Sequence, residues 1–188
     1  MSEILAEVLG TGVEIALRPA EIPDVVEDGH TLEENARIKA VAISKATGST
    51  VIADDTGLFV DALNGAPGVH SARYAGEAAD AAANVAKLLA ALDGAESRRA
   101  KFATVVVLRR PDGFELTATG EVLGVITCSP RGEAGFGYDP IFVPDELSGG
   151  TFAELSASQK HAVSHRGRAL RALAQSIADH GGLPALFA

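Results

Sequence analysis

The sequence predicts an α/β fold in which a mixed, twisted β-sheet is flanked by helices. Three observations support this class: helical periods alternate with short apolar runs, one hairpin is clear, and the strict strand–helix–strand rhythm of a parallel sheet is missing. The chain has 188 residues, of which 47% are hydrophobic and 22% are charged. This length and composition predict one globular domain over residues 1–188.

The first expected elements follow from capping residues and periodicity. Residues 2–9 favour a short capped helix, and alternating apolar residues favour a strand over 13–17. An acidic loop follows at 18–30. Thr31-Leu32-Glu33-Glu34 matches a capping box, in which the Thr hydroxyl and the Glu carboxylate accept hydrogen bonds from amides at a helix start. A helix is therefore expected from residue 32 until Gly48.

The later elements are expected from short apolar runs and turn residues. A short strand over 51–53 ends at Asp54-Asp55, and a second strand over 58–63 ends at the turn pair Asn64-Gly65. The remaining expected elements are, in order, a helix over 79–92, a hairpin of strands 102–110 and 114–127 joined by Pro111-Asp112-Gly113, a glycine-rich loop over 128–139, a strand over 141–143 and a closing helix over 166–180.

Charge and composition exclude several classes of protein. The net charge of −9 disfavours DNA or RNA as the main partner, because nucleic-acid binders usually carry the opposite sign. The longest apolar stretches are interrupted by charged residues, so a membrane span is not expected. The lone Cys128 makes no intrachain disulfide, which suits a cytoplasmic protein, and we expect it to be a buried thiol.

The first candidate site is Asp54-Asp55-Thr56-Gly57, at the end of an apolar strand. Ligands of open α/β sheets bind beyond the carboxyl ends of strands, and adjacent carboxylates there can bind a hard cation such as Mg²⁺. Because neighbouring side chains on a strand point to opposite faces, one aspartate of the pair is expected to face the ligand. Asp-rich turns containing Gly are also ordinary loop formers, so this alternative stays open.

The second candidate site is the glycine-rich segment 132–139. It lacks Gly-Lys-Ser/Thr and G-x-G-x-x-G, which excludes a P-loop and a dinucleotide fingerprint. Its two aromatic residues, Phe136 and Tyr138, either stack on a planar base or fill the core.

The third candidate is the basic segment 160–166. His161 and His165 have helical zinc-ligand spacing, but the Glu of H-E-x-x-H and a third ligand are missing, so zinc is rejected. Lys160 and Arg166 suit phosphate or base contacts, with ordinary surface charge as the alternative.

Four segments together resemble the inosine/xanthosine triphosphate pyrophosphatase family. DGHTLEENARIKA (28–40) matches the helix of that family, and VIADDTGLFVDALNGAPGVHSARYAG (51–76), PRGEAGFGYDPIFVP (130–144) and FAELSASQKHAVSHRGRAL (152–170) match its three main motifs in order. The resemblance covers almost the whole chain, and FGYD together with SHR is highly specific. It implies two lobes around a nucleotide cleft and often a homodimer.

The resemblance also implies an activity and a set of site residues. Members hydrolyse ITP, dITP and XTP to the monophosphate and pyrophosphate with Mg²⁺ as cofactor. Asp55 is then the catalytic carboxylate at the metal and Glu27 a second metal contact, although Asp24 or Asp28 could take its place. The implied substrate-binding residues are Thr56, Phe136, Gly137, Tyr138, Asp139, Lys160, His165 and Arg166.

One departure from the family pattern leaves a second function open. Members begin with an apolar strand and a Thr-x-Asn-x-x-Lys loop that holds the triphosphate, whereas this sequence starts directly at the following helix. We expect a late-annotated start site or a truncated form. The alternative function is a noncatalytic purine-nucleotide-binding protein. A phosphatase acting on another metabolite would release inorganic phosphate instead.

Overall fold

The computed structural model describes residue 5 and residues 14–77, 80–147 and 149–187. Its helices and strands are α2 (Leu32–Thr47), β1 (Val51–Val60), β2 (Pro67–Gly68), α3 (Ala81–Ala91), β3 (Arg99–Arg109), β4 (Glu115–Ile126), β5 (Phe142–Pro144), α4 (Ala157–Val163), α5 (His165–Asp179) and α6 (Gly182–Phe187). The five strands form one sheet in the order β2-β1-β3-β4-β5. The β1–β2 and β4–β5 pairings are antiparallel. The predicted α/β class, a sheet flanked by helices, is confirmed.

The chain divides into two compact units, and β1, β3 and β4 each contribute residues to both. The first unit comprises Met1–Asp55, Thr104–Gly120 and Arg166–Ala188, and the second comprises Thr56–Ala103 and Glu121–His165. The expectation of a single domain over the whole chain stays a prediction.

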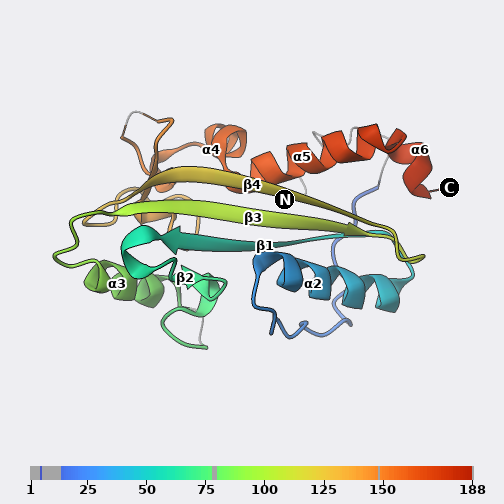
Figure 1. Cartoon of the computed structure of the whole chain (residues 1–188), viewed down its shortest axis with the longest axis horizontal. Helices are drawn as coiled ribbons and strands as arrows, with labels where there is room; N and C mark the ends of the chain where they lie inside the picture. The colour runs from blue at the N-terminus through green and yellow to red at the C-terminus, as the bar shows by residue number, and fades with distance from the viewer. Residues whose placement is uncertain (1–4, 6–13, 78–79, 148, 188) are drawn as a thin grey trace. The chain divides into compact units, whose positions relative to one another are not determined.

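In the first unit, α2 and α5 lie on opposite sides of the strand segments (Figure 1). The core beneath α5 joins Val106 and Leu108 of β3 with Leu170 and Leu173 of the helix. Burying such side chains contributes about 1.5–3 kcal/mol each, which fixes the helix on the sheet.

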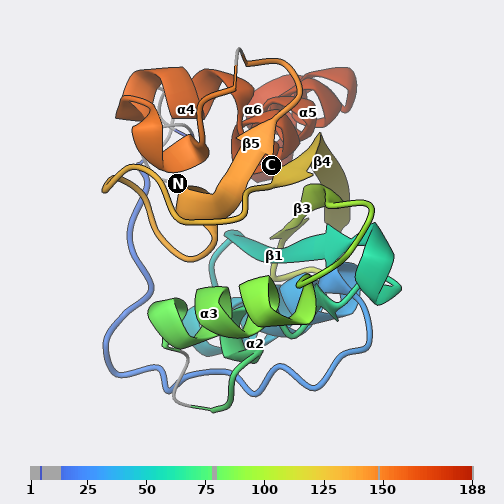
Figure 2. The same ribbon diagram turned by 90° about the vertical axis from the view of Figure 1, so that its left-hand side faces the viewer.

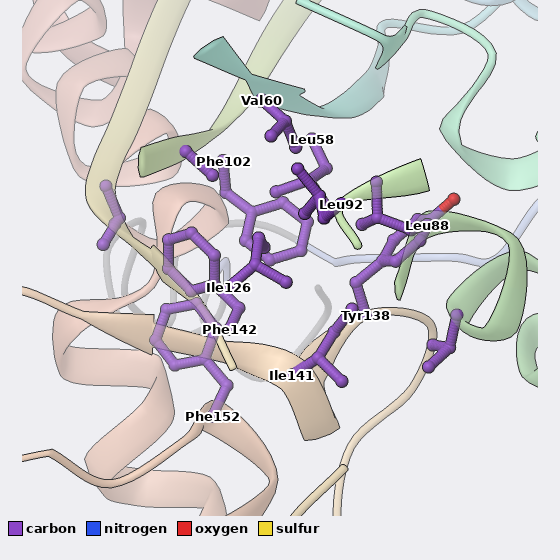
Figure 3. Packing of buried hydrophobic residues seen from close by; sticks show 13 residues of the cluster. Leu58, Val60, Leu88, Leu92, Phe102, Ile126, Tyr138, Ile141, Phe142 and Phe152 are labelled. Carbon is purple, nitrogen blue, oxygen red and sulfur yellow. The ribbon is translucent and has the colours of Figure 1, made fainter. Parts of the chain in front are cut away.

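The core of the second unit is formed by aromatic and aliphatic side chains around the strand ends. The helix α3 packs against these strands (Figure 2). Figure 3 shows Leu58 of β1, Phe102 of β3 and Leu88 of α3 converging with Phe142 and Phe152. The Phe102 and Phe142 rings meet edge to face, with their centroids 4.7 Å apart.

The capping residues in the sequence predicted the ends of α2 correctly. The Thr31 hydroxyl accepts a hydrogen bond from the Glu34 amide at 3.1 Å, and the Glu34 carboxylate accepts one from the Thr31 amide at 3.1 Å. Gly48 ends the helix in the left-handed conformation with φ of 65°. Both capping predictions are confirmed.

Three local expectations were wrong. Residues 14–17 form no strand, because alternation gives a strand only where a neighbour pairs with it, and no described strand does so. Residues 51–60 form one strand, β1, in place of the two strands expected over 51–53 and 58–63, and residues 61–63 form a short 3-10 helix. Cys128 is exposed, since it follows the end of β4 in a loop. The short helices α4 and α6 were not anticipated.

One expected element lies mostly outside the described residues. The helix expected over 2–9 lies outside the described residues except for Leu5, which is helical and buried. In the described part of the chain, every helix is too short or too polar to cross a membrane.

Candidate functional site

The first cluster of chemical groups lies in the first unit, where a lysine joins two carboxylates. The Lys39 ammonium donates a hydrogen bond to Glu27 Oε2 at 2.9 Å and another to Asp55 Oδ1 at 3.2 Å. The second oxygen of Asp55 accepts a hydrogen bond from the Asn35 amide at 3.2 Å. We call Glu27, Lys39 and Asp55 the carboxylate–lysine cluster.

The cluster combines an acidic loop, a helix and a strand of the same unit. Asn35 and Lys39 are four residues apart on α2, so both side chains lie on one helix face. Asp55 is in the middle of β1, and Glu27 lies in the loop before α2. Three segments separated in sequence therefore supply the groups.

The environment of Asp55 makes its carboxylate a better proton acceptor than an ordinary aspartate. Burial raises the pKa of Asp55, and the charge of Glu27 acts in the same direction. The charge and hydrogen bond of Lys39 and the Asn35 amide act in the opposite direction without cancelling the effect of burial. Such opposed influences are common at functional sites.

Asp54 and Asp55 have different partners, as expected for neighbours on a strand. Asp54 Oδ2 accepts a hydrogen bond from Arg166 Nε at 2.8 Å, and both groups belong to the first unit. Arg166 begins the unit's segment on α5, whereas Lys39 is on α2. The prediction that the two carboxylates point in opposite directions is confirmed by these partners.

The second cluster lies in the second unit and combines an aromatic ring, a carboxylate and a lysine. Asp139 is 2% exposed, accepts a hydrogen bond from the Phe136 amide at 2.7 Å and forms an ion pair with Lys160. The Lys160 ammonium lies 4.5 Å from the centroid of the Phe136 ring, a cation–π distance. We call Phe136, Asp139 and Lys160 the aromatic–lysine cluster.

A glycine permits the backbone of this second cluster to fold tightly. Gly135 has φ of 81°, and a Cβ atom there would lie 2.1 Å from Asp139 Oδ2. No other residue type would fit without moving the carboxylate. The glycine-rich composition of the segment thus serves a close approach of side chain to backbone.

The two aromatic residues of this segment differ in burial: one fills the core and the other is exposed. Tyr138 is buried in the core, and its hydroxyl donates a hydrogen bond to the Ser71 carbonyl at 2.9 Å. Burial raises the pKa of Tyr138 far above its ordinary range. Phe136 is 63% exposed. Tyr138 therefore anchors the loop, and Phe136 presents the ring that can stack on a planar group.

The remaining predicted residues of the second unit lie on different elements. Thr56 follows Asp55 in β1 and is partly exposed, and Gly137 has φ of 60°, where a Cβ atom would have no neighbour within 4 Å. His165 is buried, and its ring stacks on Phe102 with centroids 4.6 Å apart. His161 is on α4 and His165 on α5, so the helical zinc spacing does not apply to them.

Among the acidic candidates, Glu27 is the one that shares a partner with Asp55. Asp24 pairs with Arg18 at 2.6 Å, and Asp28 is exposed. Sequence reasoning missed Asn35 and Lys39. The sequence feature that could have indicated them is their i,i+4 spacing, which places two polar residues next to the apolar positions of α2. Within the described residues, no group of three or more His, Cys, Asp or Glu side chains could hold a metal ion.

The sheet and its flanking helices define an α/β protein, and each of its two compact units carries one cluster of charged side chains. The Ham1 family profile matches residues 1–176, and the chain belongs to the Ham1 family.

Three relatives illustrate the similarity. A dITP/XTP pyrophosphatase of Syntrophobacter fumaroxidans is 55% identical over 151 residues, covering 79% of this chain and 64% of that protein. A dITP/XTP pyrophosphatase of Geobacter sulfurreducens is 51% identical over 163 residues, covering 86% of this chain and 81% of that protein. The structure of a HAM1 protein from Coxiella burnetii superposes with a TM-score of 0.84 at 41% identity, covering 95% and 94% of the two chains. The chain thus spans less than two thirds of the first relative.

Proposed function

We propose that this protein hydrolyses deaminated purine nucleoside triphosphates, namely dITP, XTP and ITP, to the monophosphate and pyrophosphate. The main support is that about half of the aligned residues are identical to those of proteins named dITP/XTP pyrophosphatase. The carboxylate–lysine cluster is the feature of this chain that suits such chemistry. A noncatalytic nucleotide-binding protein is not favoured, because these relatives are named as enzymes.

The carboxylate–lysine cluster suits a magnesium ion. Mg²⁺ takes oxygen ligands and is usually held by one or two carboxylates together with substrate phosphates. The carboxylates of Glu27 and Asp55 share one cation, the Lys39 ammonium, so they are spaced to act on a common positive charge. Glu27 and Asp55 would hold the ion, which would neutralise phosphate charge and lower the pKa of a water molecule.

Asp55 is the proposed proton acceptor. The water oxygen forms a bond to the α-phosphorus, and the bond from that phosphorus to the bridging oxygen of the β-phosphate breaks. The electron pair leaves with pyrophosphate, one proton of the water passes to Asp55, and the other stays on the oxygen now bound to the α-phosphorus. Burial raises the pKa of Asp55, which favours proton acceptance by this carboxylate when no cation is bound to it. Lys39 and Asn35 keep the carboxylate oriented.

The other predicted residues are proposed to bind the substrate. Phe136 has the exposed ring that can stack on a purine, and Lys160, held by Asp139, supplies positive charge beside that ring. Arg166, oriented by Asp54, is proposed as a phosphate contact, because its guanidinium offers several donors. Thr56, Gly137, Tyr138 and His165 complete the proposed set, with Tyr138 acting through the position of the loop.

Selectivity is proposed to depend on the 6-oxo group of the base. That oxygen accepts hydrogen bonds from protein donors, whereas the 6-amino group of adenine presents another donor and leaves the protein donors unpaired. Buried unpaired groups discriminate strongly, by factors of about 10⁴ or more. ATP is therefore the key comparison substrate.

The test is product analysis with purified protein, Mg²⁺ and dITP, ITP, XTP, GTP or ATP in water enriched in ¹⁸O. Phosphorus NMR of the products should detect pyrophosphate, with the label in the monophosphate. Label in pyrophosphate would mean attack at the β-phosphate and would refute the proposed step. Release of inorganic phosphate would favour a phosphatase, and binding of dITP without turnover would favour the noncatalytic alternative.

Magnesium as the cofactor, assembly as a homodimer and a cytoplasmic location stay predictions. Light scattering of the purified protein measures its molar mass and therefore tests the homodimer. Replacing Mg²⁺ by Ca²⁺ in the dITP assay tests the cofactor, because Ca²⁺ takes more ligands at longer distances.

A further inference from the structure

Asn35 is a buried polar residue that joins two parts of the carboxylate–lysine cluster. Its side chain is on α2 and the residue is 1% exposed. The amide nitrogen donates to Asp55 Oδ2 at 3.2 Å, and the amide oxygen accepts from the Gly29 backbone N–H at 2.9 Å. A buried amide destabilises a fold unless both ends are hydrogen-bonded, and here both ends are used.

Gly29 gives a second, steric observation at the same place. A Cβ atom on Gly29 would lie 2.7 Å from Asn35 Oδ1 and 2.7 Å from Glu34 Cβ. The loop can approach α2 this closely only where the residue has no side chain. Glu27 is two residues before this contact, so docking of Gly29 on Asn35 restricts where the Glu27 carboxylate can lie.

We propose that Asn35 is a positioning residue that sets Glu27 and Asp55 for binding a divalent cation. It holds Asp55 through its amide nitrogen and the loop that carries Glu27 through its amide oxygen. Residues that orient metal-binding carboxylates typically contribute 10- to 100-fold to metal affinity. This inference rests on the proposed function, which assigns the cation to Glu27 and Asp55.

The test uses Mn²⁺ alone, titrated into the protein without nucleotide and followed by electron paramagnetic resonance. Asn35→Ala should raise the dissociation constant for Mn²⁺ about 10-fold or more. The matched control is Asn84→Ala in the second unit. Asn84 is 4% exposed and also uses both amide ends, accepting from the Ala75 amide at 2.6 Å and donating to the Ala72 carbonyl at 2.9 Å. It should leave Mn²⁺ affinity unchanged.

A second pair of variants perturbs the loop without changing Asn35. Gly29→Ala should weaken Mn²⁺ binding, whereas Gly150→Ala should not, because a Cβ on Gly150 would have its nearest neighbour, Glu154 Oε2, at 4.0 Å. The Mg²⁺ concentration for half-maximal dITP hydrolysis should rise in Asn35→Ala and Gly29→Ala but not in Gly150→Ala, with a smaller change in kcat at saturating Mg²⁺. This pair keeps the proposal testable if Asn35→Ala does not fold.

Each outcome has a distinct meaning. Equal Mn²⁺ affinity in wild type, Asn35→Ala and Gly29→Ala would overturn the inference and leave the proposed hydrolysis standing. Equal weakening by Asn35→Ala and Asn84→Ala would mean a general loss of packing, which also overturns it. Absence of saturable Mn²⁺ binding by the wild type would overturn both the inference and the proposed metal site. The proposed hydrolysis is tested separately, by the turnover of dITP.

Discussion

The buried ion pair between Asp139 and Lys160 should be more important for stability than any exposed ion pair of the same unit. Asp139→Asn leaves an oxygen that can accept the Phe136 amide hydrogen but removes the negative charge that faces Lys160. The Lys160 side chain is 15% exposed, so its ammonium would stay in a poorly hydrated place without a counter-charge. A buried charge without its partner is costly.

The expected decrease in the free energy of unfolding of Asp139→Asn follows from the burial of the pair. Removing one member of a buried pair destabilises proteins by about 3–5 kcal/mol, and the flexible lysine can turn partly towards water, so we expect about 3 kcal/mol. For a chain of this length, each kcal/mol lowers the melting temperature by roughly 2–4 °C. The expected change for Asp139→Asn is therefore a decrease of about 6–12 °C.

Thermal and urea unfolding followed by circular dichroism measure this loss. The control is Asp145→Asn, because Asp145 and its partner Arg99 are both exposed and make two hydrogen bonds, at 2.8 and 2.7 Å, so this variant measures what an exposed two-point ion pair contributes. The double variant Asp139→Asn with Lys160→Met should recover part of the stability, since no lone charge remains. If Asp139→Asn cost no more than Asp145→Asn and the double variant recovered nothing, the buried-pair argument would be wrong.

Three further predictions concern other carboxylates. Asp55→Asn should lower the rate of pyrophosphate release by about 10²–10⁴-fold without changing the melting temperature appreciably, and retained turnover would refute its role as proton acceptor. Asp54→Asn should raise KM for dITP several-fold more than it lowers kcat, because Arg166 loses the partner of its Nε; steady-state kinetics measure the split. Burial raises the pKa of Glu115, but hydrogen bonds from Arg37 and Arg109 outweigh that effect, so the pKa is lowered overall. Its contribution to stability is therefore present above the ordinary glutamate pKa and lost as pH falls through the lower folded value. Glu115→Gln should cost roughly 1–2 kcal/mol at pH 7 and progressively less as the pH falls below the ordinary glutamate pKa, and a loss that did not change with pH would contradict this linkage.

Elements whose ends are defined by local chemistry were predictable from the sequence. The Thr31–Glu34 box and Gly48 define α2, and the loop Arg110–Phe114 closes the hairpin through the Arg110 amide and the Phe114 carbonyl at 2.9 Å. Each of these features depends on residues within about four positions of one another. Short-range hydrogen bonds and backbone preferences are therefore readable without knowledge of the tertiary fold.

Elements that depend on distant partners were predicted less well. The alternation over 13–17 is compatible with a strand, but Leu17 is exposed and residues 14–17 pair with no described strand. The run of polar residues at Asp54-Asp55 suggested the end of a strand, yet β1 continues to Val60. Its carboxylates stay within the strand because Arg166 and Lys39, distant in sequence, supply the counter-charges.

The same distinction explains the candidate site. Asp55, Phe136 and Lys160 were found from motifs, whereas Asn35 and Lys39 act through contacts with a strand that begins after their helix has ended. Their i,i+4 spacing predicts a shared helix face but not what that face meets. Asn35 is the more informative of the two, because a fully buried amide beside Leu32 and Ala36 must find partners outside its own helix. A buried Asn on the apolar face of a helix therefore indicates a polar contact across the core, and here that contact is the carboxylate proposed to accept the proton.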